Sequence, residues 1–370
     1  MPCRACGDDR NDGVAKVIHT SSRDVRRRLG VLLVCAVVSA VALALATRGG
    51  SGLVRTYGWK QLRFGGRTYR VLAYVPARLG MAYRAPVVVV LHGCAMTAEQ
   101  EALASDFAPV ADRGRFIVIY PEVDSADMAY GWCWKAIWDP AAERRGHGDA
   151  AAIVAITRAA MSTWRVDRSR VYVIGISAGA FESATLGANY PDVYASIGIH
   201  SGAAYHGGGE GCLPGAVLPS TTNDAARAAL AAMGDHARVV PVIVLHGDRD
   251  ETIPTHCGAQ AVQQWLETDN LVLRRSHHAP PYISRRVTRH SATDGHQAYS
   301  VVSYRTGWSC PLVQYWIIDG MGHAWAGGSN DPAVARFSDP SGPSAAAAAW
   351  AFLSHWTLNR GATTCTAHLP

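Results

Sequence analysis

The sequence predicts an α/β protein in which a mostly parallel β-sheet carries helices on both faces. Short runs rich in Val and Ile alternate along the chain with Ala-rich segments of helical length, as in repeated strand–helix units. The 370 residues are 49% hydrophobic and 17% charged, which supplies a large core and excludes a disordered or low-complexity protein. After residue 46 no repeat and no linker rich in Pro, Ser or Thr interrupts the sequence, so we expect one catalytic domain over residues 47–370.

The expected strands and helices follow from these runs in chain order. Apolar, β-branched segments predict six strands of a central sheet: Thr68–Val75, Pro86–Leu91, Phe116–Tyr120, Val171–Ile174, Ala195–Ile199 and Val240–Leu245. Ala-rich or amphipathic segments predict four helices: Asp149–Trp164, Ala178–Asn189, Gly258–Glu267 and Ser344–Trp356. Ala298–Tyr304 and Val313–Ile318 flank a Gly-containing turn, which predicts a hairpin. The polar stretch 269–297 is expected to be a surface excursion, in the simplest case a solvated loop.

The first 46 residues read as a leader rather than as part of the domain. Three arginines (residues 26–28) precede an uncharged run of 18 residues, 29–46, which ends in Ala-Leu-Ala. This order is typical of a secretory signal peptide, and an uncleaved run of this length could also serve as a signal anchor. Either way residues 47–370 lie outside the cytoplasm. We expect a secreted or envelope-associated protein that meets a membrane only through an uncleaved leader.

The charge distribution argues against a nucleic-acid partner, and the cysteine content indicates an oxidising compartment. The formal charge is +6, and residues 1–46 contribute +3 of it, from seven basic and four acidic residues. The remaining chain is nearly balanced, so no nucleic-acid partner is expected. Six of the nine cysteines fall outside the leader, and an even number suits an oxidising compartment: Cys94, Cys133, Cys212, Cys257, Cys310 and Cys365. Six cysteines allow 15 pairings, among which spacing does not choose.

A strand–turn–helix segment carries the first chemical signal. Gly175-Ile176-Ser177-Ala178-Gly179 fits the pattern G-x-S-x-G, with the strand Val171–Ile174 before it and an Ala-rich helix after it. This context predicts a nucleophile elbow, in which small neighbours permit a strained turn that exposes a serine oxygen. The start of the helix also offers the free backbone N–H of Ala178 to an oxyanion.

A serine nucleophile needs a histidine base and a carboxylate, which follow it in that fold in the order Ser, acid, His. The acidic turn 246–254, containing Asp248 and Asp250, comes directly after an apolar strand. His323 lies in a glycine-containing loop after another strand. An earlier strand ends in His92-Gly93-Cys94, where the N–H of Cys94 can be the second oxyanion donor. We expect His92 itself to be structural.

These motifs resemble the extracellular poly(3-hydroxybutyrate) depolymerase and esterase family of α/β-hydrolases, which includes feruloyl and acetyl xylan esterases. The similar stretches lie within residues 60–356: Leu91–Cys94, Cys133-Trp134, Arg144–Asp149, Val166-Asp167, Arg170–Val173, Gly175–Gly179, Tyr190–Val193, His200–Gly202, His246–Asp248 and Gly322–Trp325. The resemblance implies an α/β-hydrolase fold and an esterase that needs no cofactor and no metal.

The resemblance also assigns roles to individual residues. It implies Ser177, Asp250 and His323 as the triad, because the family uses the second aspartate of the acidic turn. It implies a disulfide between Cys94 and Cys133. Two aromatic residues near this bridge, Trp132 and Trp134, are expected either to line the acyl pocket or to pack the core.

The expected function is hydrolysis of carboxylic esters through an acyl-enzyme, with hydroxyalkanoate oligomers or polymer, or short-chain acyl esters, as substrates. Only 14 residues follow Trp356, so we expect oligomers or small esters rather than solid polymer. Ala180 stands where the family often has a second glycine. The alternatives are a carbohydrate esterase that removes feruloyl or acetyl groups and a non-catalytic envelope binding protein built on the same fold. A peptidase is less favoured, because no gating domain is visible.

Overall fold

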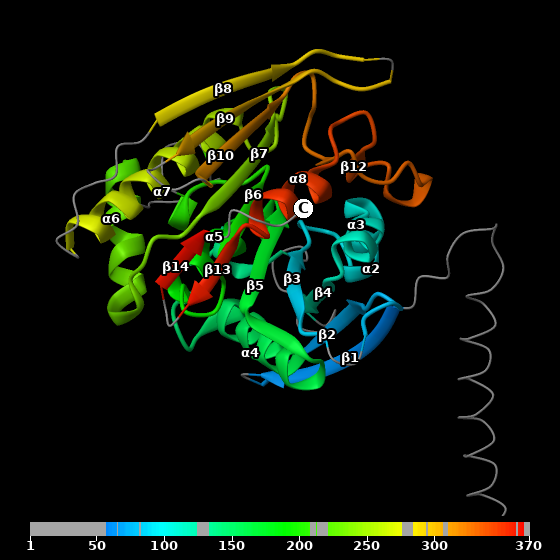
Figure 1. The fold of residues 1–370 in the computed structure, drawn as a ribbon, viewed down its shortest axis with the longest axis vertical. Coiled ribbons are helices and arrows are strands. Elements are labelled where there is room, and N and C mark those ends of the chain that lie inside the picture. Colours follow the sequence, from blue (N-terminus) through cyan, green and yellow to red (C-terminus); the bar gives the residue numbers. More distant parts are fainter. Residues whose placement is uncertain are drawn as a thin grey trace, which may run out of the picture. The chain divides into compact units, whose positions relative to one another are not determined.

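The protein is organised around one ten-stranded β-sheet, as its computed structural model shows (Figure 1). The structure describes residues 57–64, 66–80, 83–123, 133–207, 212, 221–275, 284–293, 295–305, 310–359 and 362–365. The leader expected over residues 1–46 lies outside these ranges. Within them, every helix is too short or too polar to cross a bilayer.

The sheet has a parallel centre and an antiparallel pair of strands at each edge. Its strands in spatial order are β1 (Tyr57–Phe64), β2 (Arg67–Tyr74), β4 (Ile117–Val123), β3 (Ala85–Leu91), β5 (Val166–Ile176), β6 (Ser196–His200), β7 (Val242–Gly247), β10 (Pro311–Ile318), β9 (Tyr299–Arg305) and β8 (Ser284–His290). The pairings from β4 to β10 are parallel, and the outer ones are antiparallel. The predicted mostly parallel α/β sheet is confirmed.

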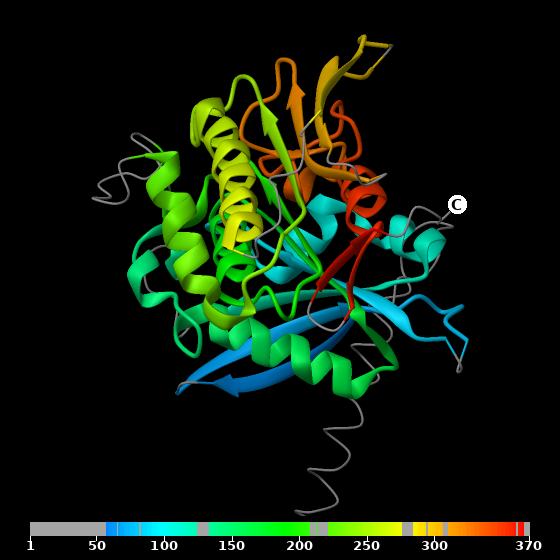
Figure 2. The ribbon, with the colours of Figure 1, turned by 60° about the vertical axis from the view of Figure 1, so that its left-hand side comes forward.

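Helices cover both faces of this sheet and bury most of its central strands. One face carries α4 (Gly148–Thr163), α5 (Ala178–Asn189), α6 (Thr222–Met233) and α7 (Thr255–Arg275); the other carries α2 (Ala98–Ser105), α3 (Phe107–Gly114) and α8 (Ala345–Leu353) (Figure 2). The four valines of β3 are fully buried. Strands enclosed on two faces read as continuous apolar runs, which is why the sequence reveals them.

Two small strand pairs and several short helical turns complete the described chain. The strand pairs are β11 (Trp325–Ala326) with β12 (Ser338–Asp339) and β13 (Trp356–Asn359) with β14 (Ala362–Cys365). The 3₁₀ turns include η2 (Lys135–Ile137), η3 (Pro140–Ala142), η4 (Tyr205–Gly207), η5 (Gly234–His236) and η6 (Pro332–Val334).

Most of the expected elements are present, and one expectation is corrected in part. Helix α5 spans Ala178–Asn189 as predicted, and β9 and β10 form the predicted antiparallel pair. The stretch 269–297 is not a loop throughout: residues 269–275 complete α7, and Ser284–His290 form the edge strand β8. Residues 285–290 of this strand are all exposed, so it shows no apolar alternation, and its pairing with β9 is what defines it.

Three disulfides join the six cysteines outside the leader. The pairs are Cys94–Cys133, Cys212–Cys257 and Cys310–Cys365. The first pair confirms the bridge implied by the family resemblance. It ties the loop after β3 to the segment before η2 and so positions the site described next.

Candidate active site

Ser177 occupies a strained turn between β5 and α5. Its backbone has φ 55° and ψ −124°, a conformation that costs a non-glycine residue about 1–3 kcal/mol and that is concentrated at functional sites. A Cβ at Gly175 would collide with the carbonyl of Gly179, and a Cβ at Gly179 would collide with the carbonyl of Leu91. Both glycines of the motif are therefore required by close backbone approach.

His323 and Asp250 form a hydrogen-bonded pair beside this turn. His323 Nδ1 lies 3.0 Å from Oδ1 and 2.8 Å from Oδ2 of Asp250. The Asp250 side chain is fully buried, whereas that of His323 is 20% exposed. With Nδ1–H donating to the carboxylate, Nε2 is the nitrogen that can accept a proton.

Asp250 is held as an ionised carboxylate by several donors. Oδ1 accepts the backbone N–H groups of Thr252 at 3.0 Å and Ile253 at 2.9 Å, and His246 Nε2 lies 3.4 Å from Oδ2. Burial alone raises the pKa of Asp250, but the hydrogen bonds from His246, His323 and Ile253 outweigh it and hold the pKa well below its usual range. The carboxylate therefore stays negative beside the histidine.

The neighbouring aspartate has a different partner. Asp248 is exposed, and its Oδ1 accepts the backbone N–H of Gly320 at 2.6 Å. This bond ties the end of β7 to the loop that carries His323. Of the two aspartates in the acidic turn, the structure thus brings only Asp250 to the histidine ring.

Ser177 and His323 line the same cavity, which has a volume of about 410 Å³. Six of the twelve described lining residues have large apolar side chains: Met96, Ile137, Trp138, Ile176, Ile253 and Phe337. A cavity of this size with apolar walls and a few polar groups suits a small organic ligand.

The loop after β3 forms the side of the cavity next to the serine. Gly93 and Cys94 line the cavity, and a Cβ at Gly93 would lie only 3.3 Å from the Cβ of Ser177. The N–H of Ala178 is the first of α5, so it has no partner within the helix. Of the two expected oxyanion donors, Cys94 thus lines the cavity, and Ala178 directly follows Ser177 in the chain.

The expected aromatic wall is corrected in part. Trp134 is fully buried and is absent from the described lining; its Nε1–H donates to the His92 carbonyl at 3.0 Å, and the two rings lie 4.8 Å apart. It supports the loop after β3 from behind. Trp138, which is 45% exposed, lines the cavity instead. Trp132 lies outside the described residues.

Removing the Cys94–Cys133 bridge is expected to have two effects that can be measured separately, one on stability and one on catalysis. Replacing both cysteines by Ala opens a closure of 39 residues and should lower the free energy of unfolding by about 4 kcal/mol. Because Cys94 is the expected second oxyanion donor and the bridge holds its loop, kcat should also fall about tenfold or more. Urea unfolding and initial rates measure the two effects.

The matched control is the Cys310–Cys365 pair, which has a sequence separation of 55 residues. Neither of these two cysteines lines the cavity. Its double Ala variant should lose similar stability with kcat within about twofold of wild type. Equal kcat for both double variants would contradict a positioning role for the Cys94–Cys133 bridge.

A buried histidine that the sequence did not single out supports the base. His200, at the end of β6, accepts the Ala326 N–H on Nε2 at 3.1 Å, and its Nδ1 lies 3.1 Å from the Ser201 hydroxyl. Its ring stacks on Trp325 at 5.0 Å. His200 thereby anchors the segment that immediately follows His323. His200 belongs to the stretch His200–Gly202, which is similar to the family named above. This similarity is the sequence signal that points to a role for His200.

His200 makes stability sensitive to acid. Burial, followed by the nearby charges of His246 and His323, lowers its pKa to about 3, whereas a histidine in an unfolded chain titrates near 6.5. Between these values the unfolded state binds the extra proton, so stability falls as pH drops. Between pH 7 and pH 5, His200→Gln should lose about 2 kcal/mol less stability than the wild type. Urea titrations at both pH values check this, and equal losses would contradict it.

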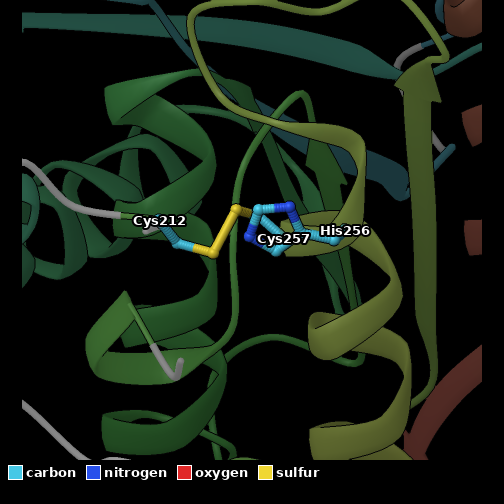
Figure 3. Close-up of side chains that lie close together, drawn as sticks. All are labelled: Cys212, His256 and Cys257. Carbon is cyan, nitrogen blue, oxygen red and sulfur yellow. A yellow bond between two sulfur atoms is a disulfide. The ribbon is translucent and has the colours of Figure 1, made fainter. Parts of the chain in front are cut away.

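One group of potential metal ligands exists among the described residues. The ligand atoms of Cys212, His256 and Cys257 all lie within 4.8 Å of one another. Figure 3 shows the two cysteines joined through their sulfurs, with the His256 ring beside them. Metals bind thiolates, so in this oxidised form the group offers a metal only the exposed imidazole.

Comparison with known proteins assigns most of the chain to one family, including the segment that carries Ser177 and Asp250. The family model "Esterase PHB depolymerase" matches residues 70–279. The chain is 28% identical over 264 residues to poly(3-hydroxyalkanoate) depolymerase C of Paucimonas lemoignei, covering 69% of this chain and 58% of that protein. It is 30% identical over 212 residues to feruloyl esterase B of Neurospora crassa, covering 53% and 68%.

A solved structure supports the fold. The acetyl xylan esterase from Aspergillus awamori superposes with a TM-score of 0.57 at 22% identity, covering 72% of this chain and 94% of that one. The chain spans just over half the length of the depolymerase it matches. On the strength of the family match, which includes the serine and the acidic turn, the protein belongs to the PHB depolymerase esterase family.

Proposed function

We propose that the protein is a serine esterase that hydrolyses carboxylic esters through an acyl-enzyme. The observation that carries the proposal is the pairing of His323 with the buried Asp250 at the cavity lined by the strained Ser177. A family of esterases supports the same reaction class.

The roles follow from the geometry. Ser177 Oγ attacks the ester carbonyl while His323 Nε2 takes its proton, and His323 then gives this proton to the departing alcohol. Asp250 fixes the tautomer of His323 and stabilises the imidazolium that forms. The N–H groups of Ala178 and Cys94 stabilise the oxyanion of each tetrahedral intermediate. A water molecule activated by His323 then releases the acid and regenerates Ser177.

The substrate we propose is a short-chain acyl ester or a hydroxyalkanoate oligomer. The predominantly apolar wall of the 410 Å³ cavity suits a short aliphatic acyl group, and one relative is named a poly(3-hydroxyalkanoate) depolymerase. Feruloyl or acetyl esters of carbohydrates are the second candidate, because other relatives are named feruloyl and acetylxylan esterases.

We further propose that the protein works outside the cytoplasm. Three disulfides tie together distant parts of the described domain, and such bonds persist in oxidising compartments. The leader predicted from the sequence agrees with this location.

The test is hydrolysis of p-nitrophenyl butyrate by the full chain with its disulfides formed, beside the Ser177→Ala variant. Turnover that depends on Ser177 supports the esterase. Methyl ferulate and acetylated xylan, run in parallel, separate the two substrate classes. Folded wild type that is as inert as the variant on every ester would overturn the proposal and favour a binding protein.

A further inference from the structure

The cavity contains one cation that the proposed ester hydrolysis does not use. Arg336 lines it together with Ser177 and His323. Among the described lining residues it is the one side chain with a permanent charge, and none of them is an aspartate or glutamate. The guanidinium lies 4.3 Å from the centre of the Phe337 ring and forms no ion pair with a described residue.

Arg336 is attached to the same framework as the catalytic base. Phe337 accepts the Trp325 N–H at 2.7 Å, and β12, which follows directly, pairs with β11. Trp325, which follows His323 by two residues in the chain, stacks on the ring of His200. The segments that carry the base and the guanidinium are therefore bound to each other, so the distance between His323 and Arg336 is set by the fold.

An exposed arginine that stacks on an aromatic ring and lacks a carboxylate partner is prepared to bind an anion. Its planar fork matches a carboxylate, and stacking limits the rotamers that must be ordered on binding. The apolar walls nearby weaken solvent screening of such a contact. A neutral ester gains nothing from this group.

We propose that Arg336 is a specificity residue that binds a free carboxylate on the substrate. The preferred substrates are then linear hydroxy-acid oligomers cleaved near their acid end, where the carboxylate lies only a few bonds from the scissile carbonyl. This inference rests on the proposed esterase function and names the substrate class within it. The products are shorter hydroxy acids, so an upstream reaction must shorten the polymer to supply such oligomers.

A matched pair of substrates isolates the charge. The linear dimer of 3-hydroxybutyrate and its terminal primary amide have the same single ester bond and nearly the same shape, but only the acid is anionic. The wild type should cleave the acid with a kcat/KM about threefold to fivefold higher, as expected for an exposed ion pair of good geometry. Chromatography of the released 3-hydroxybutyrate measures both rates, and 0.5 M NaCl should reduce the ratio.

Variants then assign the preference to one residue. Arg336→Gln should lower kcat/KM for the acid to that of the amide and leave the amide rate within about twofold. The control is Arg168→Gln, which removes the same charge at the other end of β5, about 30 Å from Ser177. This variant should keep the wild-type ratio.

The outcomes separate the two proposals. If p-nitrophenyl butyrate is hydrolysed but the dimer is not, or if Arg336→Gln keeps the wild-type ratio, the role of Arg336 is wrong and the esterase stands. A wild-type ratio at or below one would also overturn it. If no ester is cleaved by the folded protein, the proposed function fails and this inference fails with it.

Discussion

Replacing Ser177 by Ala is expected to lower kcat for p-nitrophenyl butyrate by about 10⁶-fold, because no other group at the elbow can form the acyl-enzyme. The oxyanion donors and the His323–Asp250 pair remain in the variant, so a residual rate above the uncatalysed reaction is expected. KM should change little, since the hydroxyl contributes little to the apolar wall that holds the acyl group. Steady-state kinetics with a sensitive end-point assay measure the loss.

The control for this variant lies in the adjoining helix. Ser183→Ala removes a hydroxyl from the fully buried face of α5 and leaves the cavity lining intact, so its kcat should stay within about threefold of wild type. Circular dichroism and thermal unfolding establish that both variants are folded. If folded Ser177→Ala retains more than a hundredth of the wild-type kcat, Ser177 is not the nucleophile.

Replacing Asp250 by Asn is expected to lower kcat by about 10⁴-fold. Oδ1 could still accept the N–H groups of Thr252 and Ile253, but the new NH₂ would face His323 Nδ1 and favour the tautomer that carries its proton on Nε2. That nitrogen could then no longer accept the proton of Ser177. The loss of negative charge also removes the stabilisation of the imidazolium.

Asp248→Asn is the matched control, since it makes the same chemical change two residues away. Its amide oxygen can still accept the Gly320 N–H, so kcat should remain within about threefold of wild type. Comparable losses in the two variants, measured at pH 8 where a free histidine is neutral, would show that the turn acts through loop stability rather than through the contact with His323.

The central strands and the helix after the elbow could be predicted because local sequence and tertiary environment agree there. Strands β3 and β5 are enclosed by helices and carry uninterrupted apolar runs, and α5 is rich in Ala. The peripheral elements give weaker signals. Helix α2 spans only eight residues, and three of the four residues that α6 buries are alanines. Neither helix therefore gives a strong apolar periodicity in the sequence.

For the site, the local sequence is enough to predict the chemistry of the elbow. The serine, its two glycines and the N–H of Ala178 lie within five residues, so their arrangement follows from local backbone geometry alone. The order of acid and histidine along the chain, each after a strand, likewise placed them at the same edge of the sheet, because the carboxyl ends of parallel strands meet there.

Which side chains contact one another in the site depends on the tertiary fold. Asp248 and Asp250 have the same chemistry and differ in sequence by two positions, yet one meets Gly320 and the other meets His323. The three disulfide pairings, the burial of Trp134 and the entry of Arg336 into the cavity also join segments far apart in the chain. Such contacts depend on the paths of the loops that connect the strands and on how these loops pack against one another. The residue types and the local spacing do not specify these paths.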